Sequence, residues 1–172
     1  MSKKALFIIP PERFNEDELF HPKEELENNG IEVTISSTKI GQIKGDYEGK
    51  VDAEVIFRDT SVTNYDIIAV IGGSGTNDYL CENQELQDYL KKAYDEKVLL
   101  TGICAGAVAV AKTGLLSGRE ATCYPIDMQI NELQANNVKY VNQHVVAHED
   151  IITGDGPEGA REFGENLVAA LR

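Results

Sequence analysis

The chain has 172 residues, of which 42% are hydrophobic, so it is long enough to bury a core as one domain over residues 1–172. Its 16 basic and 29 acidic residues give a net charge of −13, which argues against nucleic acid or an anionic membrane as a main partner. Three cysteines without paired spacing make no disulfide framework and favour a reducing cytoplasm. The apolar run before Pro10, Ala5 to Ile9, has only five residues, too few for a signal peptide or a membrane span.

The first half of the chain alternates apolar runs with helical patterns. Residues 4–9 form an apolar run typical of a buried strand, residues 17–29 predict a helix, and residues 32–36 alternate like a second strand. Glycines and short alternating runs over residues 41–59 predict a small hairpin or an irregular excursion from the main sheet. Residues 65–71 predict another buried strand.

The second half continues the alternation. After a predicted helix over residues 83–96, an apolar strand over residues 98–103 passes directly into a helix rich in Ala and Val over residues 105–111. The last predicted elements are short strands over residues 120–123, 145–148 and 151–153, and a helix over residues 158–171. This order predicts a three-layer α/β fold, with helices on both faces of a mostly parallel sheet.

A parallel sheet binds ligands outside the carboxyl ends of its strands. Three predicted strand ends meet at that edge: the loop after Ile9, the Gly72-Gly73 turn and Cys104. The spacing Gly102-x-Cys104-x-Gly106 is typical of a nucleophile elbow, where a sharp strand-to-helix turn leaves no room for neighbouring Cβ atoms. The start of the following helix favours a thiolate with a lowered pKa. The alternative is that Cys104 is a small buried hydrophobe.

The Gly72-Gly73 turn also has two interpretations. It is either a flexible exit from a buried strand or part of an oxyanion hole. In the second case, the backbone N–H groups of Gly73 and Ala105 stabilise a developing negative oxygen.

Several short segments resemble the ThiJ/PfpI superfamily, which includes deglycases and intracellular proteases. The elbow Ile103-Cys104-Ala105-Gly106 is the most specific of them. The other segments are Glu18-Leu19-Phe20-His21-Pro22, Asn29-Gly30-Ile31-Glu32-Val33, Tyr65-Asp66 running into Gly72-Gly73, Tyr124-Pro125 and Gly156-Pro157. The resemblance covers nearly the whole chain and implies a flavodoxin-like sheet, as in class I glutamine amidotransferases.

The resemblance assigns roles to two residues. It places the family's cysteine nucleophile at Cys104 and its glutamate, which hydrogen-bonds the sulfur and relays protons, at Glu18. Such a glutamate needs a pKa raised by burial and by the nearby sulfur. Without the resemblance, Glu18 is one more charge on an acidic, solvated helix face.

The chain also departs from the family pattern. PfpI-type proteases carry a histidine where Ala105 stands, and the deglycase branch carries one where Tyr124 stands. Neither position therefore supplies the imidazole that a cysteine protease needs. Tyr124 either donates a hydrogen bond to a bound carbonyl or packs in the core. Asp155 replaces an arginine of many relatives and would repel an anionic substrate.

These features lead to one expected function and two alternatives. We expect a cofactor-independent glyoxalase or deglycase whose substrate is a small carbonyl compound or a glycated protein, with Cys104 and Glu18 as catalytic residues. The alternatives are a PfpI-type protease or amidase, and a redox sensor or chaperone that uses Cys104 oxidation. No metal-ligand spacing or phosphate loop is present, and the adjacent His148 and Glu149 do not fit a glutamine amidotransferase triad. The resemblance also implies a homodimer or larger homo-oligomer.

Overall fold

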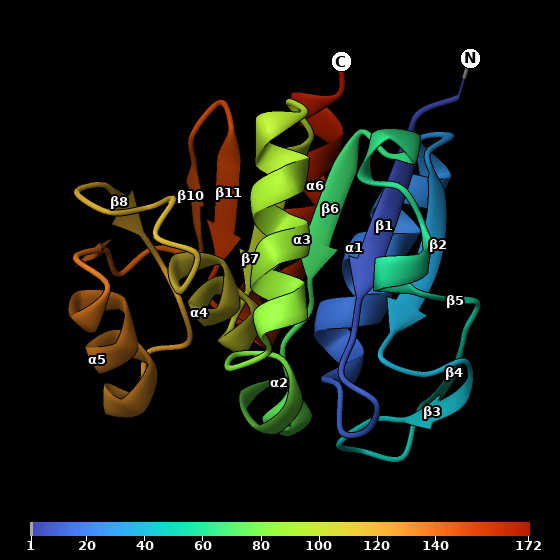
Figure 1. Cartoon of the computed structure of the whole chain (residues 1–172), viewed down its shortest axis with the longest axis horizontal. Coiled ribbons are helices and arrows are strands. Elements are labelled where there is room, and N and C mark those ends of the chain that lie inside the picture. The colour runs from blue at the N-terminus through green and yellow to red at the C-terminus, as the bar shows by residue number, and fades with distance from the viewer. Residues whose placement is uncertain (1) are drawn as a thin grey trace.

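The computed structural model describes residues 2–172 and has three layers, with a seven-stranded sheet between two layers of helices (Figure 1). The predicted fold class is thereby confirmed. The strand order across the sheet is β10-β11-β7-β6-β1-β2-β5, and all neighbours are parallel except β10 and β11. The strands are β1 (Lys4–Ile8), β2 (Glu32–Ser37), β5 (Val55–Ile56), β6 (Ile67–Val70), β7 (Leu99–Ile103), β10 (Val145–Ala147) and β11 (Ile151–Gly154).

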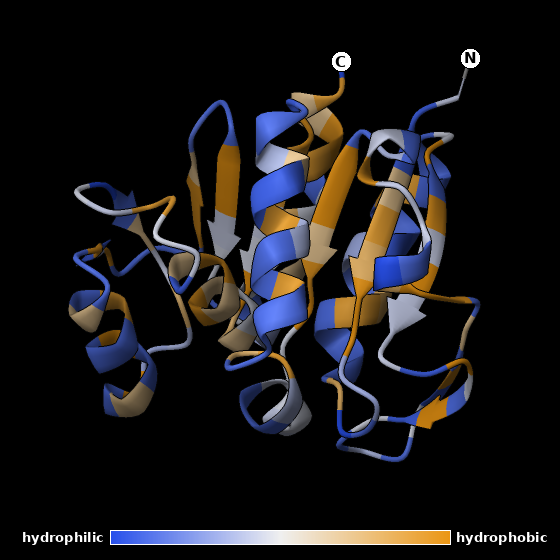
Figure 2. Ribbon diagram, viewed as in Figure 1, coloured by the Kyte–Doolittle hydropathy of each residue, from blue (hydrophilic) through white to orange (hydrophobic). Residues whose placement is uncertain are grey.

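Helices cover both faces of this sheet. On one face lie α1 (Glu16–Asn28) and α6 (Ala160–Ala170), which pack against each other. On the other lie α3 (Gln84–Asp95) and α4 (Ala105–Ala111), and each face has its own cluster of buried apolar side chains. Figure 2 shows hydrophobic colours along the strands and a hydrophilic outer surface on α3. The central strands are uniformly apolar because a parallel sheet is buried on both faces.

The register of the central strands brings their carboxyl ends to one level. Ile8 of β1 pairs with Val70 of β6, and Val70 pairs with Gly102 of β7. The loop after β1, the glycine turn after β6 and Cys104 after β7 therefore meet at one edge of the sheet. This edge lies at the bottom of Figure 1, opposite the two chain termini.

Two small sheets lie outside the main one. The excursion predicted for residues 41–59 is a hairpin of β3 (Gly41–Lys44) and β4 (Lys50–Ala53), after which β5 rejoins the main sheet. The predicted strand near residue 120 is β8 (Glu120–Ala121), which pairs with β9 (Lys139–Tyr140) and not with the main sheet.

Two helices were not predicted: α2 (Ser74–Tyr79) and α5 (Asp127–Ala135). The first is short and rich in Gly, Asn and Asp, residues that favour turns. In α5 only Gln129 and Leu133 are buried, so its inward face has no apolar periodicity. Short 3₁₀ turns occupy Phe57–Asp59, Val62–Asn64 and Pro157–Gly159. Within residues 2–172, no helix has the length and apolar character needed to cross a bilayer.

Candidate active site

Cys104 lies at the sharp turn between β7 and α4, as the spacing of the glycines predicts. Its backbone has a φ of 59° and a ψ of −124°, a strained conformation for a residue with a side chain. The Cys104 N–H donates to the Gly154 carbonyl (3.0 Å), which ties the turn to β11. A Cβ at Gly102 would lie 2.5 Å from the Gly106 carbonyl oxygen, and one at Gly106 would collide with the Val70 carbonyl oxygen. Both flanking positions therefore require glycine.

Glu18 reaches the same place from the first turn of α1. Its side chain is only 1% exposed, so it does not lie on a solvated face. Asn15 positions it in two ways, because the Asn15 side chain accepts the Glu18 backbone N–H (3.0 Å) and the Asn15 N–H donates to the Gly72 carbonyl (2.9 Å). The Gly72 N–H donates to Glu18 Oε1 (2.9 Å), whereas the buried Oε2 has no hydrogen-bond partner within residues 2–172.

Glu18 and Cys104 meet at Gly72. A Cβ added there would collide with Glu18 Oε1 and would lie 2.8 Å from Cys104 Cβ. A glycine is required because the carboxyl and the thiol side chain occupy the space where a Cβ would project. The two residues that the family resemblance pairs are therefore neighbours in space, although 86 positions separate them in sequence.

The electrostatics of Glu18 and Cys104 differ from the expected lowering of the thiol pKa. Burial raises the pKa of the Glu18 carboxyl well above its usual range. Burial, followed by the charge of Glu18, also raises the pKa of the Cys104 thiol, while the Ala105 N–H and Gln129 act in the opposite direction. The prediction of a lowered thiol pKa is thus wrong. The effect of the start of α4 is outweighed because the sulfur is buried and faces a carboxyl group.

The two expected oxyanion donors follow neighbouring strands, Gly73 after β6 and Ala105 after β7 and Cys104. Gly73 has a φ of 130°, and a Cβ there would collide with the backbone of the loop that follows β1. Its N–H donates to no acceptor within residues 2–172. The Ala105 N–H lies against the Cys104 sulfur. Their joint role toward a substrate oxygen stays a prediction.

Tyr124 does not pack in the core, so that interpretation is wrong. It is 40% exposed, and its ring covers Gly156. A hollow of about 280 Å³ lies beside it, lined by Tyr124, Pro125, Asp155, Gly156, Pro157 and Glu158. The Asp155 carboxylate that faces this hollow pairs with His144 (2.7 Å), and its other oxygen is buried without a hydrogen-bond partner within residues 2–172.

None of the three histidines is hydrogen-bonded to Cys104. His21 contacts Asp17 and Arg161, His144 pairs with Asp155, and His148 bonds the Glu120 carbonyl. The other two cysteines, Cys81 and Cys123, are buried, and burial raises the pKa of each thiol to about 12. Residues 2–172 hold no group of three or more His, Cys, Asp or Glu side chains placed to bind a metal ion.

One residue at the site was missed from sequence. Gln129 of α5 is 3% exposed, and its Nε2 lies 3.5 Å from the Cys104 sulfur. Nothing in the local sequence singles it out, because the helix that carries it has no amphipathic pattern.

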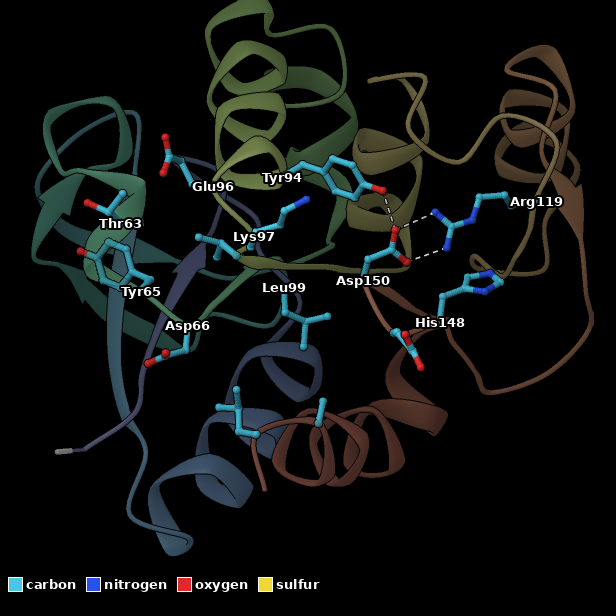
Figure 3. Close-up of a pocket in the computed structure, with 14 residues that line it drawn as sticks. Thr63, Tyr65, Asp66, Tyr94, Glu96, Lys97, Leu99, Arg119, His148 and Asp150 are labelled. Atoms are coloured by element: carbon cyan, nitrogen blue, oxygen red, sulfur yellow. Dashed lines mark hydrogen bonds and ion pairs between the residues drawn. The ribbon is translucent and has the colours of Figure 1, made fainter.

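Another hollow, of about 980 Å³, lies at the opposite edge of the sheet, where β7 begins (Figure 3). Figure 3 shows Asp150 between Arg119 and Tyr94, and it accepts hydrogen bonds from both. These groups satisfy one another and position no nucleophile, so the edge that carries Cys104 is the better candidate.

A family model described as the DJ-1/PfpI family matches residues 3–170. An uncharacterised protein of Methanocaldococcus jannaschii is 33% identical over 168 residues, which cover 98% of this chain and 82% of that protein. A glutathione-independent glyoxalase of Caenorhabditis elegans is 27% identical, over 98% of this chain and 89% of that protein. A deglycase of Pyrococcus abyssi is 28% identical, over 97% of this chain and 99% of that protein.

Solved structures resemble the fold along its whole length. A ThiJ/PfpI domain protein of Brachyspira murdochii superposes with a TM-score of 0.94 at 24% identity, over 99% of this chain and 96% of that one. DJ-1beta of Drosophila melanogaster superposes with a TM-score of 0.88 at 28% identity, over 99% of this chain and 91% of that one.

Proposed function

The chain belongs to the DJ-1/PfpI family, and from this premise we propose that it is a cofactor-independent enzyme acting on small electrophilic carbonyls. Cys104 is the nucleophile and Glu18 the proton relay. The single observation that carries the proposal is the buried contact of Glu18 and Cys104 at Gly72, which keeps a carboxyl of raised pKa beside a thiol. Relatives named as a glyoxalase and a deglycase support this class of substrate.

The first step forms a hemithioacetal with a 2-oxoaldehyde such as methylglyoxal. Glu18 accepts the thiol proton as the Cys104 sulfur attacks the aldehyde carbon. A C–S bond forms, the carbonyl π bond breaks, and the oxygen takes the proton back from Glu18. Because burial raises the pKa of the Glu18 carboxyl, this group holds the transferred proton more firmly than an exposed carboxyl would, until the substrate oxygen takes it.

The next steps convert the hemithioacetal into a hydroxy acid. Glu18 carries a proton from the former aldehyde carbon to the neighbouring carbon, and the hydroxyl proton passes from the first oxygen to the oxygen of that neighbouring carbon, which leaves a thioester of lactate on Cys104. Water then cleaves the thioester, releases lactate and restores the thiol. The sum is methylglyoxal plus water to lactate, so no oxidant or reductant is consumed. A glycated amine or thiol would follow the same course with a larger leaving group.

Backbone N–H groups supply the stabilisation of the substrate oxygen. The Gly73 N–H has no acceptor within residues 2–172, and the Ala105 N–H lies against the Cys104 sulfur. Tyr124 is partly exposed, lines the hollow of about 280 Å³ and is hydrogen-bonded through its backbone to Gln129; we assign its hydroxyl as a donor to the second carbonyl of the substrate.

The test is turnover of methylglyoxal to lactate without glutathione. We expect multiple turnovers by the wild type, loss of at least about 10²-fold in kcat for Cys104→Ser and Glu18→Gln, and unchanged turnover for the matched control Cys123→Ser. Glu18→Gln is informative because the amide oxygen still accepts the Gly72 N–H while the group no longer exchanges a proton. Turnover that survives Cys104→Ser would refute the proposed nucleophile.

A wild type without turnover of either methylglyoxal or glycated substrates would refute the carbonyl chemistry itself. In that case stoichiometric peroxide oxidation of Cys104 would favour the redox sensor, and hydrolysis of peptides would favour the protease. The site offers the protease no hydrogen-bonded imidazole within residues 2–172.

A further inference from the structure

Gln129 is a buried polar side chain on a helix whose other buried residue is Leu133. A buried amide is costly unless its hydrogen bonds are satisfied, so its partners are informative. Gln129 Oε1 accepts the backbone N–H of Tyr124 (3.0 Å), and Nε2 lies 3.5 Å from the Cys104 sulfur.

The orientation of this amide follows from its partners. The Tyr124 N–H can only donate, so the group that faces it must be the amide oxygen. The NH₂ group must then point at Cys104. Gln129 therefore presents an N–H donor to the sulfur, and the bond to Tyr124 holds that donor in place.

The groups around the sulfur include carboxylates but no bonded cation within residues 2–172, so an N–H donor would stabilise a negative sulfur there. Glu18 of α1 is the titratable group beside Cys104, and the carboxylates of Asp46 and Asp155 lie close enough to act on Glu18. Within residues 2–172, no Lys, Arg or His forms a hydrogen bond or ion pair with Glu18 or Cys104. A negative sulfur in this pocket is therefore stabilised by neutral groups: the Glu18 carboxyl once it has taken up the thiol proton, the Ala105 backbone N–H and the Gln129 side chain.

We propose that Gln129 is a catalytic residue that donates a hydrogen bond to the Cys104 thiolate, a stabilising role that a histidine side chain takes in other thiol enzymes. The inference deepens the proposed function and rests on it for the identity of the reaction. Through Tyr124, the same amide also couples the sulfur to the wall of the neighbouring hollow.

The test measures the reactivity of Cys104 directly, without a carbonyl substrate. The rate of alkylation by iodoacetamide is followed from pH 5 to 10 by mass spectrometry of tryptic peptides. Residues 59–91, 98–112 and 120–139 form separate peptides that contain Cys81, Cys104 and Cys123 respectively. The peptides of Cys81 and Cys123 report unfolding, because both thiols are buried in the native fold.

Two variants distinguish hydrogen-bond donation to Cys104 from the structural role of Gln129 as acceptor of the Tyr124 N–H. Gln129→Glu keeps an oxygen for the Tyr124 N–H but replaces the amide donor with a group that is negative when ionised, whereas Gln129→Met loses both bonds. For Gln129→Glu we expect the rate of Cys104 alkylation at pH 7 to fall about tenfold. The rate–pH profile should move upward by about one pH unit, the shift that corresponds to a tenfold smaller thiolate fraction. We expect Gln129→Met to slow alkylation as well, with Cys81 and Cys123 still protected.

Wild-type alkylation rates and an unchanged pH profile in Gln129→Glu would overturn the proposal, even if Gln129→Met reacted slowly, since Gln129 would then only anchor Tyr124. The two proposals fail independently. Absence of methylglyoxal turnover by the wild type counts against the carbonyl chemistry, whereas the alkylation profile of Gln129→Glu decides the role of Gln129 alone.

Discussion

Gly72 is the residue on which the geometry of the candidate site depends most directly. Its N–H holds Glu18, its carbonyl accepts the Asn15 N–H, and its missing side chain makes room for both Glu18 and Cys104. A methyl group at this position has no free space, because Ile103 O also lies 2.8 Å from the place of a Cβ.

We therefore predict that Gly72→Ala separates the carboxyl from the thiol. Overpacking should lower the free energy of unfolding by about 1–3 kcal/mol and reduce carbonyl turnover at least tenfold. The matched control is Gly114→Ala, where a Cβ meets nothing within 4 Å and only backbone strain at a φ of 85° is added. Urea unfolding and turnover of both variants check this. Normal turnover by Gly72→Ala would show that the contact at Gly72 does not matter for the reaction.

Burial of Glu18 also makes a prediction about stability and pH. Because the pKa of Glu18 is raised in the folded state, the folded protein holds this proton after the unfolded chain has lost it. Stability therefore falls as the pH rises above about 4.5, the ordinary pKa of the carboxyl, up to the raised value. Glu18→Gln should remove this cost and so increase the free energy of unfolding at pH 8.

The gain should vanish near pH 4, where the carboxyl is protonated in both states. Urea unfolding of Glu18→Gln at pH 4 and pH 8 measures it, with Glu165→Gln as control, since Glu165 is exposed on α6. An equal effect of Glu18→Gln at both pH values would mean that its pKa is not the cause.

The site residues differ in how far sequence could predict them. Cys104 could be located because the elbow imposes glycines at fixed spacing, and the collisions at Gly102 and Gly106 give the physical reason. Glu18 could be found only through the family resemblance, because a buried carboxyl and a solvated one look the same in sequence. Gln129 could not be found, since its contact with the sulfur depends on the packing of a helix that has no apolar pattern.

The same contrast holds at the scale of elements. The strands of the main sheet were predictable because burial on both faces demands continuous apolar runs, as in β6 and β7. The segments α2 and α5 were not, because each lies at the rim and contributes few apolar residues to the core. The chemistry of the site thus depends partly on the elements that local patterns describe least well.

The hairpin of β3 and β4 is anchored to α1 by one carboxylate. Glu16 Oε2 accepts the backbone N–H groups of Tyr47 and Gly49, both at 2.8 Å. From the same turn, Asp46 accepts the Ser74 N–H (3.0 Å) and the Ser74 hydroxyl (2.5 Å), next to Gly73. The hairpin turn therefore connects α1 with the glycine turn of the candidate site.

We predict that Glu16→Ala loosens this connection, because two backbone N–H groups lose their acceptor, at a local cost of about 1–3 kcal/mol. Amide hydrogen exchange should speed up by at least tenfold over residues 45–49 and at Ser74, while the strands of the main sheet keep their protection. The control Glu24→Ala removes an exposed carboxylate of the same helix that contacts Arg161 at 3.6 Å. Unchanged exchange over residues 45–49 in Glu16→Ala would show that β3 and β4 hold the turn without Glu16.

At the scale of the whole molecule, negative charge is in excess. Even if each of the 16 basic residues neutralised one acidic residue, 13 of the 29 carboxylates would remain unmatched (29 − 16 = 13). Several apolar side chains stay exposed on this acidic surface, among them Ile40, Tyr47 and Met128. The homo-oligomer implied by the family resemblance stays a prediction, and its assembly would have to overcome repulsion between copies of like charge.

Self-repulsion makes the last prediction a dependence of stability on salt. Folding brings the unmatched carboxylates closer together, so they repel one another. At about 0.1 M salt, charges separated by more than roughly 10 Å are screened from one another. Exposed ion pairs, which salt weakens, contribute little each. Raising NaCl from 10 to 200 mM at pH 7.5 should therefore increase the free energy of unfolding by on the order of 1 kcal/mol, as measured by urea unfolding.

The gain should shrink near pH 4.6, the isoelectric point, where the net charge disappears. A loss of stability with salt at pH 7.5 would mean that specific ion pairs outweigh the excess of negative charge.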